Sequence, residues 1–319
     1  MTRFEKPRVA VIGTGDIGCG WAALAVSAGW AVAIYDTDSA VLQSAAERIG
    51  ERVASLVGLG RANDFVAEDA LRQMRVGRSL LQAVNDADWI IEATTDTLAT
   101  KQRLLEQIEQ VCRLHAVVTS STLTRHASEL CARLRRPERL LAANPLTPVE
   151  YLPIVEIIPG PQTDPACVED VRFWLSMLGR APVVLKKEIP GNAVTRIQAA
   201  VWRECIMLAL EGVVDLEDID TILEQGPGLS WAATGPFLTA RLMSAEAGPE
   251  IFLSELLNGL EETWAHLASW QKLPAEDRLR LIRMMERVYP AGDDGAREVR
   301  ATRLARLLAA LTPGEEPLT

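Results

Sequence analysis

The feature that most constrains this chain is a glycine-rich stretch at residues 9–18, which reads Val-Ala-Val-Ile-Gly-Thr-Gly-Asp-Ile-Gly. An apolar run typical of a buried strand leads into the glycines, and a helical pattern of apolar residues follows directly. Gly13 permits a tight turn, Gly15 lets the backbone approach a phosphate, and Gly18 lets the helix pack close to the strand. Because the N-terminus of a helix attracts anions, the stretch predicts a site for a dinucleotide diphosphate.

A carboxylate follows the second predicted strand, which covers residues 31–35. This residue, Asp36, comes about 20 residues after the glycines, where a carboxylate can accept the hydrogen of a ribose 2′-hydroxyl. Because Asp36 would repel a 2′-phosphate, we predict NAD rather than NADP. Asp16 and Ile17, which lie between the last two glycines, belong to the same predicted site. The alternative is a doubly wound sheet that binds no ligand at this position.

Strand and helix patterns alternate along the first part of the chain, which is typical of a parallel sheet covered by helices. After Asp36, the predicted strands cover residues 88–93, 116–119, 139–143, 151–158 and 182–186. Beyond Pro190-Gly191 only helices are predicted, at residues 192–210, 216–225, 235–243, 249–270, 274–288 and 295–311. We therefore predict an α/β fold with a Rossmann-type doubly wound, mostly parallel sheet in residues 1–189. A smaller all-helical domain, residues 190–319, follows.

The predicted helical domain opens on a long apolar segment. The helix at residues 192–210 carries few charged or polar side chains, which is typical of a buried central helix. Ligand sites form preferentially between domains, so we expect the substrate in the cleft between the sheet domain and the helices.

Composition excludes several classes of protein. The formal net charge is −10 and no basic block is present, so neither a nucleic acid nor an anionic membrane is an expected partner. The five cysteines are scattered and odd in number, and neither they nor the three histidines show metal-ligand spacing. Residues 1–8 do not resemble a secretory signal, and no apolar run is long enough to cross a bilayer. We expect a cytoplasmic protein with reduced thiols and no bound metal.

Several further motifs share the order and spacing of a known family. They are Trp21-Ala22, Ile91-Glu92-Ala93, Ser120-Ser121-Thr122, Pro153-Ile154-Val155-Glu156, Pro190-Gly191, Arg196-Ile197-Gln198-Ala199, Glu211-Gly212-Val213, Asp218-Ile219-Asp220 and Gly226-Pro227-Gly228-Leu229-Ser230-Trp231. With the glycine-rich stretch they resemble the 3-hydroxyacyl-CoA dehydrogenase superfamily, most closely its carnitine dehydrogenase and lambda-crystallin (L-gulonate 3-dehydrogenase) branch. The resemblance implies an NAD-dependent oxidoreductase, a homodimer built on the helical domain, and a small acid instead of an acyl-CoA substrate. It also implies that Asp96 and Lys101 contact the cofactor.

The resemblance implies a catalytic set as well, and this sequence departs from it. In the family a His takes the hydroxyl proton, a Glu orients that His, and a Ser and an Asn hold the substrate. The His position is Asn144, and the Asn of the same segment is Thr147. The Ser position, counted without gaps, is Leu123, and the Asn of the central helix is Thr195. Only the orienting Glu is kept, as Glu156.

These departures leave three interpretations. An Asn side chain cannot take a proton near neutral pH, whereas a positioned base contributes roughly 10²–10⁴-fold to a reaction such as alcohol oxidation. In the first interpretation the protein is an oxidoreductase with altered chemistry, for example at a C=N bond, and Glu156 or Tyr151 handles any proton. A second interpretation is a sensor or structural protein that binds NAD or a small acid without turnover. In the third, Ser121 or Thr122 takes the Ser role. The candidate catalytic residues are Asn144, Glu156, Ser121 and Thr195.

Overall fold

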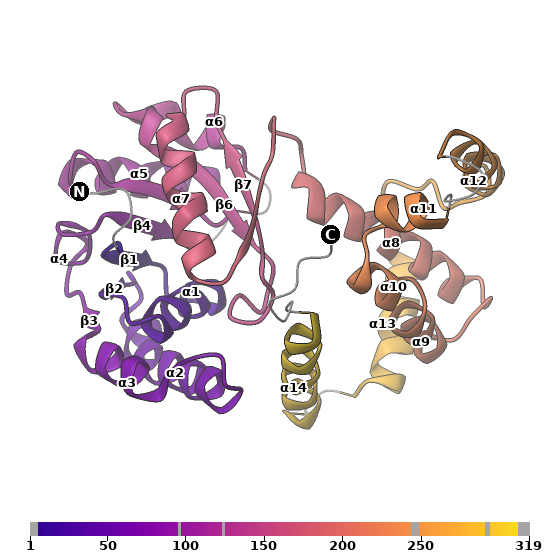
Figure 1. The fold of residues 1–319 in the computed structure, drawn as a ribbon, viewed down its shortest axis with the longest axis horizontal. Coiled ribbons are helices and arrows are strands. Elements are labelled where there is room, and N and C mark those ends of the chain that lie inside the picture. Colours follow the sequence, from indigo (N-terminus) through magenta and orange to yellow (C-terminus); the bar gives the residue numbers. More distant parts are fainter. Residues whose placement is uncertain (1–5, 95–96, 123–124, 244–248, 291–293, 312–319) are drawn as a thin grey trace. The chain divides into compact units, whose positions relative to one another are not determined.

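The computed structural model describes residues 6–94, 97–122, 125–243, 249–290 and 294–311. The chain divides into two compact units, residues 1–196 and 197–319 (Figure 1). The sheet lies in the first unit, and the second unit is helical throughout its described residues. The α/β fold with a Rossmann-type sheet domain followed by a helical domain is therefore confirmed. The border at residues 189 and 190 stays a prediction.

A single eight-stranded sheet forms the centre of the first unit, in the order β3-β2-β1-β4-β5-β6-β7-β8. Its strands are β1 (Val9–Ile12), β2 (Val32–Tyr35), β3 (Arg75–Val76), β4 (Trp89–Glu92), β5 (Val117–Ser120), β6 (Leu140–Pro145), β7 (Ile154–Pro159) and β8 (Ala181–Val184). Neighbouring strands are parallel except β6 and β7, which pair antiparallel. The order reverses between β1 and β4, so the carboxyl ends of these strands form the switch point where ligands bind in such sheets.

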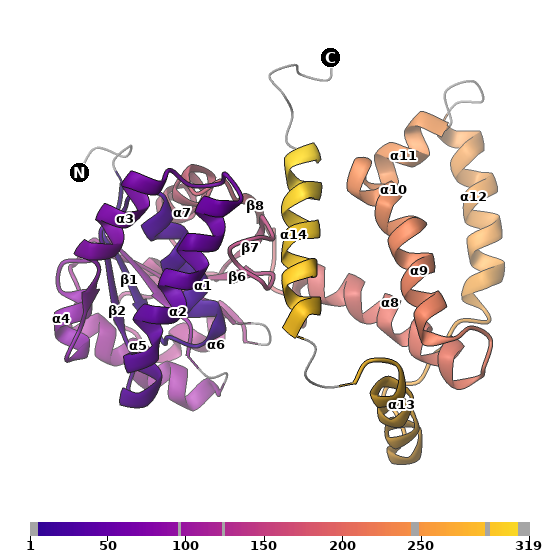
Figure 2. The same ribbon diagram turned by 90° about the horizontal axis from the view of Figure 1, so that it is seen from below.

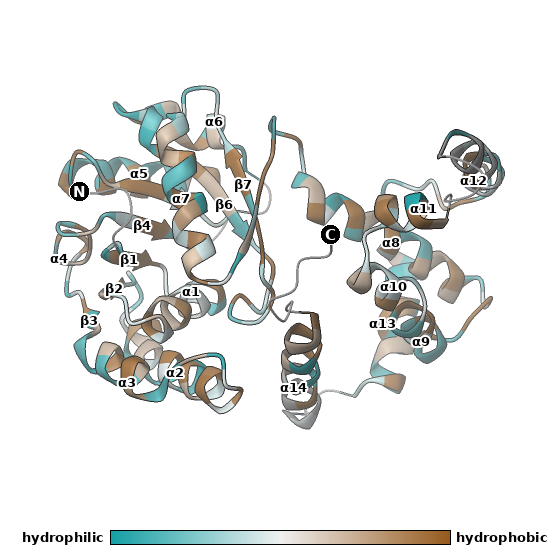
Figure 3. Cartoon of the chain, viewed as in Figure 1, coloured by the Kyte–Doolittle hydropathy of each residue, from teal (hydrophilic) through white to brown (hydrophobic). Residues whose placement is uncertain are grey.

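Helices cover both faces of the sheet (Figure 2). One face carries α1 (Asp16–Ser27), α2 (Ser39–Gly58), α3 (Asp64–Gln73) and α7 (Pro165–Met177). The other carries α4 (Leu80–Val84), α5 (Leu98–Val111) and α6 (Ala127–Leu130). On the first face Trp89 of β4 stacks on Trp174 at a centroid distance of 5.5 Å and meets Trp21 edge-on at 6.1 Å. The apolar strands that these layers bury are brown in Figure 3.

The second unit is a set of helices. After α8 (Asn192–Leu210), which begins in the first unit, come α9 (Leu216–Gln225), α10 (Pro227–Ala233), α11 (Pro236–Met243), α12 (Pro249–Trp264), α13 (Ala275–Val288) and α14 (Asp294–Leu311). The expectation of a buried central helix is wrong for the single chain, because Ile197 is 65% exposed and Trp202 is 59% exposed. In the part of the chain that the structure describes, no helix is both long and apolar enough to span a membrane.

The structure differs from the sequence-based prediction in two additional helices and in the end of a third. The sequence did not predict α4, a single short turn after Ser79, or α10, which begins at Pro227. Proline suits the first turn of a helix because its missing N–H has no intrahelical partner there. The helix predicted over residues 249–270 ends at Trp264.

Asp88 anchors the amino end of β4 through an ionic network in which its carboxylate is buried and the arginines are partly exposed. Its carboxylate accepts hydrogen bonds from Arg8 N at 3.0 Å and Arg8 Nε at 3.1 Å. Burial alone would raise the pKa of Asp88, but the bonds from Arg8 and the charges of Arg8 and Arg113 outweigh it, so the pKa lies below its usual value. A carboxylate with a lowered pKa stabilises the fold above its unfolded pKa of about 3.9 and loses that contribution as the pH falls through the folded pKa.

We expect Asp88→Asn to lower the free energy of unfolding at pH 7 by about 1–3 kcal/mol, because a buried charge-assisted network is broken. The substitution should also flatten the loss of stability of the wild type below about pH 4. Urea denaturation between pH 3 and pH 7 measures both effects. Asp86→Asn is the matched control, since Asp86 pairs with the same Arg113 at 2.9 Å but is 45% exposed. Equal losses in the two variants would contradict the role given to Asp88.

Candidate active site

The three glycines of the first loop have different surroundings. Gly13 has φ +95°, and a Cβ on it would lie 2.7 Å from the carbonyl of Ala93. A Cβ on Gly18 would lie 1.8 Å from Gly13 O, so α1 lies against the end of β1 only because this residue lacks a side chain. At Gly15 a Cβ would meet no protein atom within 4 Å. The open space at Gly15 adjoins the start of α1, whose first N–H groups have no intrahelical partner and suit an anion.

Asp36, at the end of β2, is tied to this loop. Its Oδ2 accepts hydrogen bonds from Thr14 N at 2.7 Å and Thr14 Oγ1 at 3.1 Å, and its Oδ1 accepts one from Asp38 N at 3.0 Å. A carboxylate has about four acceptor positions, so Asp36 can still accept a ribose hydroxyl. A cleft of about 570 Å³ runs along Gly13, Gly15, Asp36, Val41 and Ala93. These residues therefore fit a bound dinucleotide.

Arginines from α2 reach the same loop. Arg48 Nη2 donates to Thr14 O at 2.7 Å. Asp16, the first residue of α1, is exposed and pairs with Arg52, which also binds both oxygens of Glu150 at 2.7 and 2.9 Å. Arg52 thus offsets the negative charge of Asp16 beside the predicted diphosphate position. Ile17 is half-buried in the first turn of α1.

A buried ion pair lies at the carboxyl ends of β4 and β5. Glu92 and Lys101 are fully buried, and Lys101 Nζ lies 3.0 and 2.9 Å from the two oxygens of Glu92. Thr94 N at 2.8 Å and Ser120 Oγ at 2.5 Å also donate to this carboxylate. The structure thus places Lys101 against Glu92 in the core, and its contact with the cofactor stays a prediction. Asp96, the other residue of that prediction, lies outside the described residues.

Asn144 and Glu156 face each other across the antiparallel strands β6 and β7. Asn144 is 5% exposed, and its Nδ2 donates to Glu156 Oε2 at 3.4 Å. Glu156 Oε1 accepts the N–H groups of Ala193 at 2.7 Å and Val194 at 2.9 Å, in the first turn of α8. Among the described residues, no partner reaches the buried Oδ1 of Asn144. The pair is therefore a carboxylate held by three N–H donors, beside an amide oxygen that is free to accept.

The remaining candidate residues are placed differently. Ser121 follows β5, and its Oγ accepts a hydrogen bond from Trp21 Nε1 of α1 at 3.0 Å. Strand alternation places Ser121 on the face of the sheet that α1 covers. Ser120, Asn144 and Glu156 lie on the opposite face. Thr195 is half-buried and directly follows Val194. Leu123 lies outside the described residues. The structure therefore brings Asn144 and Glu156 into contact, and Ser121 is held by a separate partner.

The loop between β6 and β7 is fixed to the cofactor-binding helices. Tyr151, considered above as a proton carrier, has its hydroxyl 2.7 Å from Ser55 Oγ of α2. Arg180 donates to Val149 O at 3.0 Å and Leu152 O at 3.3 Å. Burial and the neighbouring charge of Arg61 lower the pKa of Arg180 to about 10. These contacts give Tyr151 a structural role in the loop that follows Asn144.

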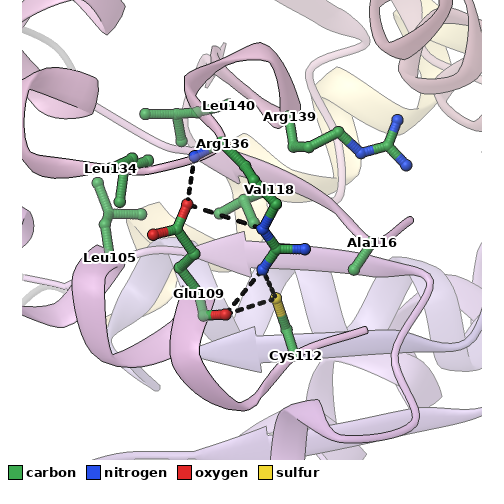
Figure 4. Close-up of a pocket in the computed structure, with 9 residues that line it drawn as sticks. All are labelled: Leu105, Glu109, Cys112, Ala116, Val118, Leu134, Arg136, Arg139 and Leu140. Carbon is green, nitrogen blue, oxygen red and sulfur yellow. Dashed lines mark hydrogen bonds and ion pairs between the residues drawn. The ribbon is translucent and has the colours of Figure 1, made fainter. Parts of the chain in front are cut away.

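A second pocket lies at the amino ends of β5 and β6, away from the glycine-rich loop (Figure 4). Arg136 Nη2 donates to Glu109 O at 2.7 Å and lies 3.8 Å from Cys112 Sγ. The cavity is only about 20 Å³, which holds about one water molecule. Burial raises the pKa of Cys112, and it does the same for Cys19, Cys131, Cys167 and Cys205. None of the five thiols is therefore activated as a nucleophile.

Comparison with known proteins agrees with this geometry. Residues 8–189 match the model of the 3-hydroxyacyl-CoA dehydrogenase NAD-binding domain, and residues 191–297 match the model of the C-terminal domain of the same enzymes. The chain belongs to the 3-hydroxyacyl-CoA dehydrogenase family. It is an NAD-dependent oxidoreductase by this membership, and NAD is its cofactor.

Two curated relatives and one solved structure illustrate the likeness. L-carnitine dehydrogenase of Bacillus cereus is 32% identical over 270 residues, which are 84% of this chain and 81% of the relative. L-carnitine dehydrogenase of Mesorhizobium japonicum is 33% identical, over 82% of this chain and 71% of the relative. A 5-formyl-3-hydroxy-2-methylpyridine 4-carboxylic acid 5-dehydrogenase, described as an NAD⁺-dependent dismutase, superposes with a TM-score of 0.80. It is 26% identical and covers 97% of this chain and 99% of its own.

Sequence reasoning did not identify Glu92, Trp21 and Arg52 as partners of site residues. For Glu92 a signal was present, because a carboxylate inside an apolar strand must find a cation or several donors. Lys101 lies on the helix that follows. For Trp21 and Arg52 no comparable signal exists, since their partners Ser121 and Glu150 lie about 100 residues away along the chain.

We expect Gly15→Ala to lower the affinity for NADH at least about 10-fold with little change in melting temperature. The added methyl group enters empty space in the free protein, and the φ of −67° suits alanine, but the methyl group would occupy the diphosphate position. Gly18→Ala should lower the melting temperature itself. Fluorescence titration with NADH and thermal unfolding measure the two effects, with Gly58→Ala at the end of α2 as control. A Gly15→Ala protein with wild-type affinity would contradict the placement.

Proposed function

We propose that this NAD-dependent oxidoreductase transfers hydride to or from a carbon that bears nitrogen, in a small substrate not joined to CoA. The observation that carries the proposal is the pair Asn144–Glu156, in which a buried amide oxygen with no partner among the residues that the structure describes lies beside an anchored carboxylate. Such a pair favours a neutral substrate amine that donates N–H and gains positive charge as hydride leaves its carbon. The relatives named for L-carnitine and for a pyridine carboxylic acid support a small substrate.

Alcohol oxidation and amine oxidation differ in where protons go. Oxidation of an alcohol to a ketone removes a hydride from carbon and a proton from oxygen, and the proton needs a base. Asn144 cannot take it, and N–H donors already occupy three of the roughly four acceptor positions of Glu156. In the oxidation of an amine, hydride leaves the carbon and the nitrogen lone pair becomes the second C=N bond. The N–H is kept, so no proton moves in that step.

The residues have distinct roles in this reaction. NAD supplies the hydride acceptor when bound. Gly13, Gly15 and the first turn of α1 would hold its diphosphate, and Asp36 its adenosine ribose. Asn144 Oδ1 accepts the substrate N–H, and the charge of Glu156 stabilises the cationic C=N⁺ group that forms. In the reverse direction the same groups bind an iminium ion, whose carbon receives hydride while its C=N pair returns to nitrogen.

A second candidate function is favoured by the way Glu156 is held. Three N–H donors fix its carboxylate, and two of them begin α8, which suits a structural helix cap. In this candidate the protein binds NAD or a small acid without turnover, as a sensor or structural protein. NADH binding without turnover of any amine, imine or hydroxy acid would favour it.

We also propose a homodimer built on the helical unit. Large apolar side chains of this unit are exposed in the single chain, among them Ile197, Trp202 and Phe237. An apolar surface of this kind usually marks an interface. A single monomeric species in analytical ultracentrifugation would contradict the dimer. The five free thiols support a reducing compartment such as the cytoplasm.

We expect Asn144→His to raise oxidation of 3-hydroxy acids by roughly 10²–10⁴-fold over the wild type, because it supplies the missing base beside Glu156. Assays at 340 nm measure this, with NAD⁺ for carnitine, gulonate and a panel of secondary amines, and with NADH for imines. The triple substitution with Leu123→Ser and Thr195→Asn should raise it further. Asn144→Leu is the control of similar size, expected to bind NADH normally and to lose activity toward amines. Strong carnitine or gulonate oxidation by the wild type would overturn the proposal.

A further inference from the structure

We propose that Trp21 is a positioning residue that makes the hydroxyl of Ser121 a hydrogen-bond donor to the carboxamide oxygen of the nicotinamide ring. The proposal rests on the NAD site and not on the reaction proposed above. It begins with the buried contact in which Trp21 Nε1 donates to Ser121 Oγ at 3.0 Å. Trp21 comes from α1, the helix that opens on the glycine-rich loop, and Ser121 follows β5.

The contact fixes the polarity of the hydroxyl. An indole N–H can only donate, so Ser121 Oγ must be the acceptor in this pair. A hydroxyl has one hydrogen and two lone pairs, and with one lone pair facing the indole its own hydrogen points elsewhere. Accepting a hydrogen bond also strengthens a hydroxyl as a donor. Ser121 is thereby prepared to bind an acceptor oxygen.

The backbone fixes where this donor lies. Ser121 N donates to Glu92 O at 2.8 Å, which holds the residue at the carboxyl ends of β4 and β5. At the switch point of such a sheet, the half of the dinucleotide that carries nicotinamide extends over the strands on this side. Ser121 is 7% exposed, whereas Thr119 is fully buried, so Ser121 is the nearer of the two to the solvent at the carboxyl ends of the strands.

A second copy of the contact shows what is special about the first. Two residues earlier on the same face of β5, Thr119 Oγ1 accepts a hydrogen bond from Trp89 Nε1 at 2.9 Å. Trp89 and Trp21 pack edge-on in one cluster. Thr119 is fully buried, so this pair serves the core alone. The two indole–hydroxyl pairs share their chemistry, but Thr119 lies farther from the carboxyl end of β5 than Ser121. The pair Trp89–Thr119 is therefore a matched control for the pair Trp21–Ser121.

The test compares two ligands that differ by the nicotinamide ring. Trp21→Phe keeps an aromatic ring in the core and removes the N–H donor, and Ser121→Ala removes the hydroxyl. We expect each to weaken NADH binding about 5-fold, the worth of one hydrogen bond, and to leave ADP-ribose binding unchanged. Calorimetric titration measures both ligands. Trp89→Phe should lower the melting temperature comparably and change neither affinity.

The double variant Trp21→Phe/Ser121→Ala should bind NADH no more weakly than Ser121→Ala alone, because the two residues act through one hydroxyl. Ser121→Thr, which keeps the hydroxyl, should restore binding. Equal loss of NADH and ADP-ribose affinity in Trp21→Phe would overturn the proposal, since it would indicate a distorted loop. Wild-type NADH affinity in Ser121→Ala would overturn it as well, and this variant decides the question if Trp21→Phe does not fold. These binding outcomes are independent of any turnover.

Discussion

The pairing of the buried carboxylate of Glu92 is the interaction on which the carboxyl ends of the strands, where the cofactor cleft lies, depend. A charged group in the core is costly unless it is paired and hydrogen-bonded, and Glu92 is paired with Lys101 at 2.9 Å while Ser120 Oγ and Thr94 N donate to it. Glu92 ends β4, and its partners come from α5, β5 and the loop after β4, so satisfying one charge fixes the relative positions of three elements. The floor of the cofactor cleft, including Ala93 and Thr94, is built on that arrangement.

A second buried carboxylate follows the same rule with a different result. In the described part of the chain no cationic side chain pairs with Glu156, which is satisfied by Asn144 and by the N–H groups that open α8. It therefore joins the β6–β7 pair to the first turn of a long helix. In the proposed function its charge serves a cationic group of the substrate, whereas the charge of Glu92 is neutralised by Lys101. The two buried carboxylates of the sheet thus differ in how their charge is compensated.

The strength of sequence reasoning differed between the cofactor site and the catalytic centre. Gly13, Gly15 and Asp36 line one cleft, as their spacing predicts, because local backbone rules and strand alternation fix such positions. The contact between Asn144 and Glu156 was also within reach, since both belong to motifs of fixed spacing on neighbouring strands. The unpaired Oδ1 of Asn144 was out of reach, because whether a buried atom finds a partner depends on every element packed around it. The exposure of α8 was missed for the same reason, since an apolar helix can face a partner instead of its own core.

The sequence by itself determined the division into a strand–helix part and a helical part, the glycine loop with its carboxylate, and the membership in a family of NAD-dependent dehydrogenases. These follow from periodicity and short motifs, whose meaning is local. Only the tertiary structure decided that Lys101 is neutralised by Glu92, that Trp21 donates to Ser121, and that Glu156 caps α8. Each of these contacts joins residues whose polar groups must be satisfied in the core, and which partner satisfies them is set by packing over the whole domain.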